Sequence, residues 1–401
     1  MGWLSLTKKS NVKHAVIFDI ASSSVGAALI THHHTKSTSP QVLYTCRTPI
    51  NFSGGNGADH LANALAQATN TAADCIRIAL SKLPKADKTF DVHVISHAPW
   101  SDSISKTENI NFQHKTKLTK GLLRKITHKY FPEATQESSN IISSRITQVT
   151  LNDYPVAKVL GNTTEKVSVT ALSSSMHMLI KNTLISTISQ ALHSKQMYFD
   201  AYTNAVSLLT ERADMENKHQ DAMLVDVGGE YIGITLIKNG ATVAKTSIDF
   251  GSNHLLRAIV AGTDMSINTA RSKLKMFNDN TCTPTECRNI SNMLSSVEEQ
   301  WVNSFGDTCA ILSKKANIPS TVFLSSSTDS YNWFTKNIEK LDFAQFTFTT
   351  KPFTVKPVLD IEDVTKFYQH AQIRKDRRLL LESLFVDKCS PNGVYGKMFM
   401  L

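Results

Sequence analysis

Two aspartates lie where an apolar run gives way to small residues. Asp19 follows the run 15–18 and precedes three serines, and Asp226 follows the run 222–225 and precedes two glycines. A second apolar run comes after each turn, so each segment predicts a β-hairpin. The backbone N–H groups of such a turn can bind a phosphate. A carboxylate beside a bound polyphosphate can hold magnesium together with its waters.

Taken alone, each aspartate could equally well open a turn by bonding the backbone with its own side chain. The two motifs are 207 residues apart, which is the separation expected of two similar half-domains that face each other across a cleft. The pair therefore favours a phosphate site between two halves.

The composition is that of a globular chain large enough for two domains. It has 401 residues, 41% of them hydrophobic, and a net charge of +9. This length can fill more than one core. The positive charge suits an anionic partner such as nucleotide, nucleic acid or acidic lipid without selecting one.

Six cysteines are scattered along the chain, unlike those of a small disulfide scaffold, so reduced thiols are expected. Cys282 and Cys287 have no second pair nearby, which argues against a zinc site. The run 32–34 is three histidines in a polar turn, where a solvated loop is the expected state.

No signal peptide, myristoylation pattern or apolar run long enough for a spanning helix is found. The expected location is the cytoplasm. The one candidate for contact with a membrane is the basic and apolar stretch Arg374–Phe385, which could lie on an anionic surface or dock its leucines on the second half.

The pattern of elements predicts an α/β protein with an interruption. Three strands, a helix at 59–83 and a strand at 90–95 form the first unit. The segment 101–194 then reads as a small α+β unit, and a second hairpin begins at 222. We expect a first half-domain at 12–100, an insertion at 101–194, a second half-domain at 195–350 and a C-terminal tail with a helix at 351–401.

This arrangement resembles the actin-like ATPase superfamily, and the insertion resembles the SHS2-type domain of its FtsA and PilM branch. The stretch Leu151–Val156 is similar to a loop found there, Ala98–Trp100 to a motif before the insertion, and Thr119–Leu123 to the start of a helix within it. The stretch 251–257 is similar to the turn after the second phosphate loop. The resemblance covers about 12–334. It implies an actin-like (ribonuclease H-like) two-domain fold with mixed sheets.

The resemblance also implies a site for ATP and Mg²⁺. Asp19 and Asp226 would hold the metal, and Asn204 is the nearest candidate to orient a water. The expected nucleotide contacts are Ser22, Ser23, Ser24, Gly228, Gly229, Gly251, Lys273 and Ser326. The chain departs from the superfamily pattern at Ala21, Glu230, Ser326 and Ser327, where glycines are usual. It also departs at Tyr231 and Gly233, where a threonine and an aspartate are usual. A carboxylate at Glu230 would repel a polyphosphate.

The function implied is that of an FtsA-like adaptor in bacterial cell division, with at most slow ATP hydrolysis. Its expected partners are adenine nucleotide, a tubulin-like division protein, other copies of itself in filaments and an anionic membrane at the inner face of the cell; no nucleic acid is expected. The alternatives are a PilM-like cytoplasmic component of type IV pilus assembly, a nucleotide-free scaffold of the same fold, and a sugar or carboxylate kinase of the same superfamily.

Overall fold

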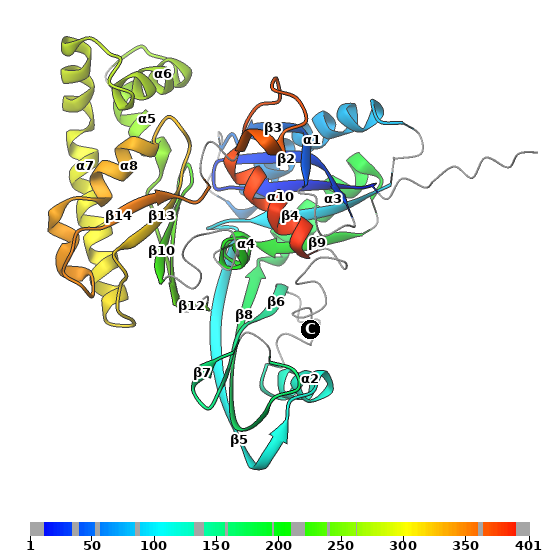
Figure 1. The fold of residues 1–401 in the computed structure, drawn as a ribbon. Helices are drawn as coiled ribbons and strands as arrows, with labels where there is room; N and C mark the ends of the chain where they lie inside the picture. The colour runs from blue at the N-terminus through cyan, green and yellow to red at the C-terminus, as the bar shows by residue number, and fades with distance from the viewer. Residues whose placement is uncertain are drawn as a thin grey trace, which may run out of the picture.

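The computed structural model describes residues 12–33, 40–52, 57–84, 89–131, 140–156, 159–194, 196–209, 221–238, 241–261, 263–359 and 364–389. They form two α/β halves and a separate small sheet that extends away from both (Figure 1).

The first half is built on a five-stranded sheet in the order β3-β2-β1-β4-β9. The first three strands form an antiparallel meander, and β4 and β9 are parallel to β1 and to each other. Their bounds are β1 Val12–Ile20, β2 Ser24–His33, β3 Gln41–Pro49, β4 Phe90–Ser96 and β9 Met197–Ala201. Helix α1 (Ala58–Ser81) covers one face of this sheet with an alanine-rich stripe.

The second half repeats this topology, with the sheet order β12-β11-β10-β13-β14. The bounds are β10 Ala222–Val227, β11 Ile232–Lys238, β12 Ala241–Ile248, β13 Thr321–Ser325 and β14 Thr354–Pro357. The accompanying helices are α5 Ser252–Val260, α6 Ile267–Asn278, α7 Pro284–Ser313, α8 Tyr331–Ile338 and the 3₁₀ helix η3 Leu341–Phe346. Trp301, Phe305 and Phe334 are fully buried between helices and sheet. Both predicted hairpins are confirmed.

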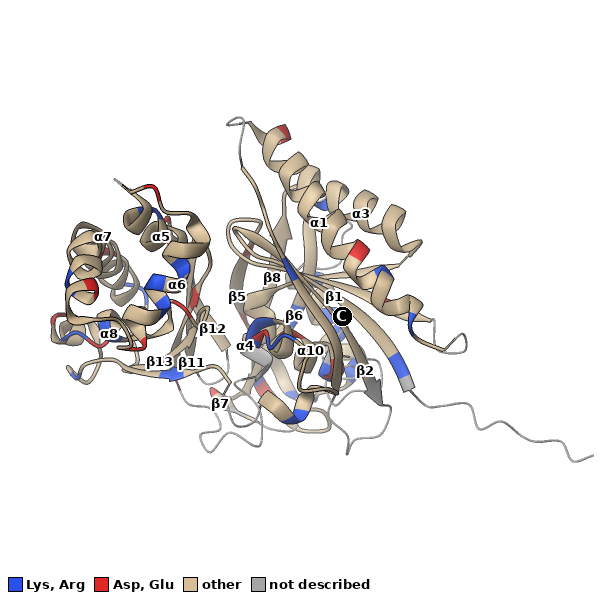
Figure 2. Cartoon of the chain, turned by 90° about the horizontal axis from the view of Figure 1, so that it is seen from above, with Lys and Arg blue, Asp and Glu red and all other residues tan. Residues whose placement is uncertain are grey.

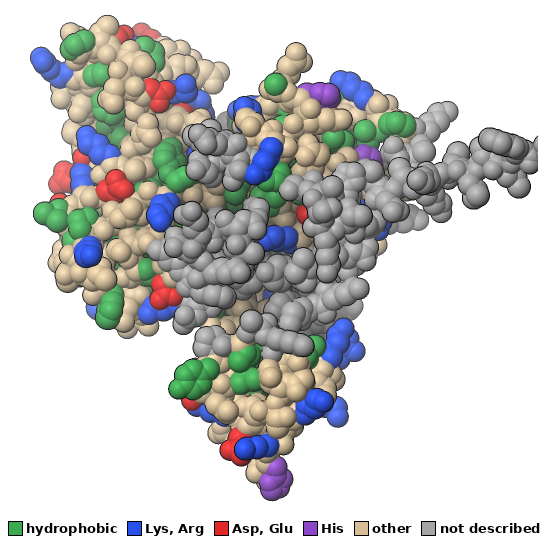
Figure 3. All heavy atoms as spheres, viewed as in Figure 1, with side chains coloured by type: hydrophobic (Ala, Val, Ile, Leu, Met, Phe, Trp, Pro, Cys, Tyr) green, Lys and Arg blue, Asp and Glu red, His purple; other side chains and the backbone are tan. Residues whose placement is uncertain are grey.

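The insertion is a four-stranded antiparallel sheet, ordered β5-β8-β6-β7, with one helix. The bounds are β5 Ser101–Lys117, α2 Lys120–Tyr130, β6 Ile141–Leu151, β7 Tyr154–Pro155 and β8 Thr163–Met176. Helix α2 is bounded by the side chain of Thr119, which accepts a hydrogen bond from the N–H of Leu122. The space-filling view shows basic side chains on this lobe (Figure 3).

Two predicted domain boundaries differ from the structure. Helix α3 (Met178–Leu192), expected in the insertion, buries Ile180, Leu184 and Ile188 in the core of the first half beside α1. Strand β9, expected in the second half, completes the first sheet. The apolar spacing of a helix is the same whichever core it faces, so the sequence pattern did not distinguish them.

The tail returns to the first half. Helix α10 (Arg377–Cys389) packs its leucines on β1, β2 and α4 (Tyr202–Leu209), and the 3₁₀ helix η4 (Thr365–Phe367) joins the same cluster (Figure 1). Leu379, Leu380, Leu381, Leu384 and Phe385 are at most 4% exposed. Of the two alternatives expected for 374–385, the structure shows docking of the leucines rather than a membrane-facing surface helix, because these side chains belong to a protein core; that core is centred on the first half, not the second.

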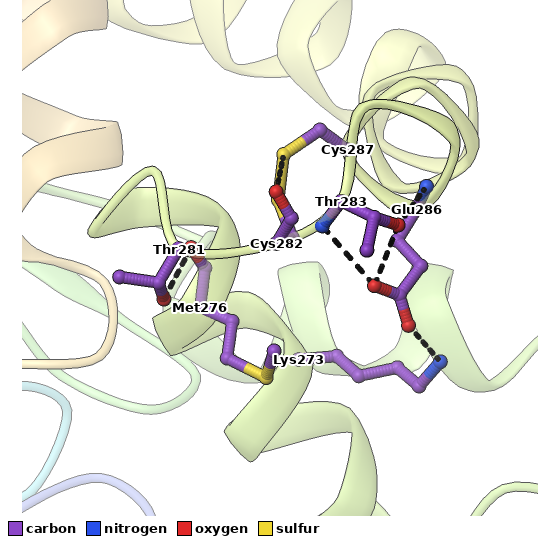
Figure 4. Close-up of a disulfide and its surroundings, with 7 residues drawn as sticks. All are labelled: Lys273, Met276, Thr281, Cys282, Thr283, Glu286 and Cys287. Atoms are coloured by element: carbon purple, nitrogen blue, oxygen red, sulfur yellow. Dashed lines mark hydrogen bonds and ion pairs between the residues drawn. A yellow bond between two sulfur atoms is a disulfide. The ribbon is translucent and has the colours of Figure 1, made fainter.

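Cys282 and Cys287 form a disulfide at the start of α7 (Figure 4). The same turn holds a capping box, in which Thr283 accepts a hydrogen bond from the N–H of Glu286 and Glu286 accepts one from the N–H of Thr283. The expectation of reduced thiols does not hold for this pair. Among the described residues, Cys46, Cys75 and Cys309 are free.

Candidate functional site

The two predicted aspartates occupy equivalent places in the two halves. Each is the residue before the last of its strand, Asp19 in β1 and Asp226 in β10. Asp19 pairs with Gly26 and Asp226 with Gly233 across the hairpins. Both aspartates are buried, with exposed fractions of 0% and 7%. The repeated topology thus brings the pair to facing strand ends, as the sequence predicted.

His97 lies between the two aspartates. It follows the end of β4, and its backbone N–H donates to the carbonyl of Ile20 at 3.0 Å. Its Nδ1 is 2.6 Å from Oδ2 of Asp226, and its Nε2 is 2.8 Å from Oδ1 of Asp19. The ring stacks on Tyr202, with centroids 4.1 Å apart. One buried imidazole therefore joins the two halves at the position where a metal was expected.

Arg47 reaches Asp19 across a row of three paired residues. Asp19, Gly26 and Arg47 are neighbours on β1, β2 and β3. Because Gly26 has no side chain, the guanidinium passes over it, and Nη2 lies 2.5 Å from Oδ2 of Asp19. A Cβ atom on Gly26 would lie 2.7 Å from this Nη2. Nε of Arg47 also donates to Asp376 at 2.7 Å.

Helix α10 supplies the last two charged groups. Arg378 and Glu382 are four residues apart and therefore lie on the same face of the helix. Nη2 of Arg378 donates to Oδ1 of Asp226 at 2.9 Å and also to the carbonyl of Val227. Oε1 of Glu382 is 3.4 Å from Nε2 of His97, and the side chain is fully buried. We call Asp19, Arg47, His97, Asp226, Arg378 and Glu382 the central charge cluster.

Charge pairing decides the protonation of this cluster. Burial opposes the charged form of Asp19, but Arg47 and His97 outweigh it and hold the pKa of Asp19 well below its usual value. Burial likewise opposes the imidazolium, yet Asp226 and Asp19 raise the pKa of His97 well above its usual value. Burial, and next the charge of Asp19, raise the pKa of Glu382 to about 8.

The two predicted phosphate turns touch each other. Oγ of Ser22 accepts hydrogen bonds from the N–H groups of Glu230 at 3.0 Å and Tyr231 at 3.4 Å. A Cβ atom on Gly229 would lie only 1.8 Å from Oγ of Ser23. Oγ of Ser24 is engaged by Arg47 at 3.1 Å. The turn N–H groups that would hold phosphates are thus partly satisfied by the opposite half.

A magnesium nucleotide does not fit this arrangement. Among the described residues, a cavity beside His97 and Asp226 measures about 20 Å³, enough for about one water. His97 and the guanidinium groups stand where a cation would neutralise the aspartates. Nucleotide binding by the predicted set therefore stays a prediction that requires the two turns to separate.

The remaining predicted contacts lie in other networks. Asn204 on α4 donates to Asp200 at 2.5 Å and to Ser143 of the insertion at 3.0 Å. Oγ of Ser326 is 2.9 Å from Oγ of Ser330. Lys273 on α6 is 4.0 Å from Glu286, beside the disulfide (Figure 4).

Gly251 precedes α5 and packs against the second turn, since a Cβ atom there would lie 2.3 Å from the carbonyl oxygen of Gly229. Glu230, where repulsion of a phosphate was expected, is instead paired with Arg257 at 2.9 Å and with Asn253 at 2.8 Å.

His97, Arg47, Arg378 and Glu382 were not among the predicted site residues. The signals for three of them are local: His97 directly follows a buried strand, and Arg378 and Glu382 interrupt an apolar helix at a spacing of four. Such interior charges indicate a buried partner. Arg47 carries no comparable signal, because its role depends on the register of three strands.

No established family profile matches the chain, and no curated protein matches its sequence. Solved structures do match. The PilM–PilN type IV pilus biogenesis complex matches with a TM-score of 0.53 and 12% identity, over 93% of this chain and 97% of the other. The fold is that of the actin-like ATPases. The ethanolamine utilization protein EutJ from Carboxydothermus hydrogenoformans also matches, with a TM-score of 0.45, 12% identity and coverage of 93% and 89%.

The actin-like fold accounts for the two equal sheets. Among the described residues, no helix combines the length and apolar character needed to cross a membrane. Acidic and basic residues are interspersed over both halves (Figure 2).

Proposed function

We propose that this chain is an assembly scaffold that keeps the actin-like fold closed without nucleotide. The observation that carries the proposal is the position of His97, 2.6 Å from Asp226 and 2.8 Å from Asp19. In this fold the ligand expected between the two halves is ATP with magnesium. Here protein side chains occupy that place, so closure comes from the chain itself.

The scaffold role also draws on the insertion. Helix α2 carries Lys120, Arg124, Lys125 and Lys129, and no acidic residue. These four side chains are exposed. An exposed basic helix on a projecting domain suits an acidic segment of another protein. We propose that the insertion is the contact domain, and that the partner belongs to a pilus-type assembly, as in the PilM–PilN complex.

Nucleotide titration tests the first part. The full chain, free of co-purified nucleotide, is titrated with ATP and ADP in magnesium by calorimetry and by thermal unfolding. We expect no heat of binding and no shift of the melting temperature at millimolar nucleotide. A ligand at 100 times its dissociation constant would stabilise the fold by about 2.7 kcal/mol, which is easily detected. Such a shift would overturn the proposal in favour of a nucleotide-binding adaptor.

Direct binding tests the second part. The immobilised full chain is offered a PilN-type protein in one experiment and a tubulin-like division protein in another. Binding of the first alone supports the pilus-type role, whereas binding of the second alone supports the FtsA-like role. The matched variant replaces Lys120, Arg124, Lys125 and Lys129 with glutamine. Unchanged binding by this variant would exclude α2 as the contact.

A further inference from the structure

We propose that Asp19, His97 and Glu382 form a binding site for one divalent transition-metal ion, with zinc as the best match. These three buried side chains come from β1, from the turn after β4 and from α10. One donor atom from each lies within 4.8 Å of the others. This proposal holds whether or not the protein binds nucleotide.

The donor geometry suits such an ion. Zinc binds imidazole nitrogen and carboxylate oxygen at about 2.0–2.2 Å, which places tetrahedral donors about 3.3 Å apart. Nε2 of His97 is 3.4 Å from Oε1 of Glu382 and 2.8 Å from Oδ1 of Asp19. The second of these distances has to widen by about half an ångström on the same principle.

One carboxylate oxygen of the cluster lacks a partner. Among the described residues, Oε2 of Glu382 is buried and accepts no hydrogen bond, whereas Oδ1 of Asp19 is 2.8 Å from Nε2 of His97. Buried polar atoms without partners are costly, and each calls for an explanation. An ion bound by the Glu382 carboxylate would give Oε2 the partner that it lacks.

The groups behind the donors are those that support a metal. Asp226 contacts Nδ1 of His97 at 2.6 Å, which directs Nε2 towards the site, and Arg47 holds the other oxygen of Asp19 at 2.5 Å. Such outer partners orient ligands and raise affinity. Counted with Asp376, which is paired with Arg47, four carboxylates surround two guanidinium groups.

This site differs from a magnesium–nucleotide site. Its donors are an imidazole and two carboxylates that bind the ion directly, and no phosphate takes part. Imidazole favours zinc, copper, iron and nickel over magnesium.

The test uses the full chain, stripped with EDTA and kept under non-reducing conditions so that Cys282 and Cys287 stay paired. Histidines 32–34 are replaced with alanine to remove an adventitious chelator. Zinc binding is measured by calorimetry, and cobalt(II) serves as the optical probe. We expect one ion per chain and visible ligand-field bands.

Three variants assign the site. Glu382→Gln keeps the shape but loses a charged donor, and we expect it to weaken zinc binding at least 10-fold. Asp226→Asn alters the outer partner of His97 and weakens the ion pair with Arg378, and we expect a 10- to 100-fold loss of zinc affinity. The matched control is Glu230→Gln. Glu230 lies in the second turn, outside the central charge cluster, so this variant should bind zinc with the affinity of the parent.

Circular dichroism verifies that each variant folds. Absence of stoichiometric zinc and of cobalt bands in the parent overturns the proposal, whatever the variants do. Equal zinc affinity in folded Glu382→Gln and Glu230→Gln also overturns it, because the ion would then bind elsewhere. Neither result affects the nucleotide titration.

Discussion

At the scale of single residues, His97 is the group on which the closed cleft depends. It is 4% exposed and pairs with carboxylates of both halves. Removing one partner of a buried charge pair typically costs about 3–5 kcal/mol, because the other charges stay buried and unpaired. We expect His97→Ala to lower the free energy of unfolding by that amount, measured by urea denaturation in EDTA. The exposed His60 on α1 is the control, since surface changes are usually within about 0.5 kcal/mol. A loss below about 1 kcal/mol for His97→Ala would contradict the bridging role.

A second prediction concerns Asp387 on α10. Burial raises the pKa of its carboxyl group from 3.8 to about 6. The folded state then binds the proton more tightly than the unfolded state. Its contribution to stability is complete below pH 3.8 and is lost as the pH rises through 6.

Asn cannot ionise, so Asp387→Asn does not lose this stability. As the pH rises from 4 to 7, the free energy of unfolding of the variant should increase relative to that of the parent by about 1–2 kcal/mol, after allowance for partial exposure. Urea midpoints at four pH values measure this difference, and other titrating groups cancel in it. Parallel stability curves would refute the assignment.

At the scale of elements, the pairing of Asp19, Gly26 and Arg47 across three strands makes a matched experiment. A Cβ atom at Gly26 would collide with the guanidinium of Arg47, whereas one at the equivalent Gly233 of the second sheet meets nothing within 4 Å. We expect Gly26→Ala to lower the free energy of unfolding by about 1–3 kcal/mol, which is typical of overpacking. Gly233→Ala should be neutral or stabilising. Thermal unfolding compares them, and equal effects would show that Arg47 moves aside freely.

Helix α10 gives another prediction at this scale. Leu384 is 4% exposed in the core of the first half, while Leu61 on α1 is 40% exposed. Leu384→Ala should cost about 2–5 kcal/mol, and Leu61→Ala much less. Similar small losses would mean that α10 does not pack as described and would revive the surface-helix hypothesis for 374–385.

The local elements could be predicted from the sequence, and their partners could not. The hairpins around Asp19 and Asp226 are short-range, so turn chemistry and apolar alternation define them. The contacts that close the site are long-range, because His97 is 129 positions from Asp226 and 285 positions from Glu382 in the sequence. The leucines of α10 have the same spacing whether they face lipid or a sheet. Only the interior charges Arg378 and Glu382 distinguish the two, and they indicate a protein core.

At the scale of the whole molecule, the central charge cluster and α10 should make the two halves unfold together. Circular dichroism reports all helices, and a double variant, Trp3→Phe with Trp100→Phe, confines tryptophan fluorescence to Trp301 and Trp333 in the second half. We expect the two signals to give one coincident urea transition. A fluorescence transition separated from that of circular dichroism would show that the halves are independent.

The insertion has a mechanical consequence. Strand β5 is 17 residues long, about 55 Å of extended chain, and it is paired with β8 along most of that length. At its root, Asp102 lies 3.4 Å from Lys245 of the second half, and Arg145 of β6 lies 2.5 Å from Asp200 of the first. The insertion is therefore attached to both halves at its base, while its far end extends away from them (Figure 1). A force that a partner applies at the far end would act on both halves through these two ion pairs.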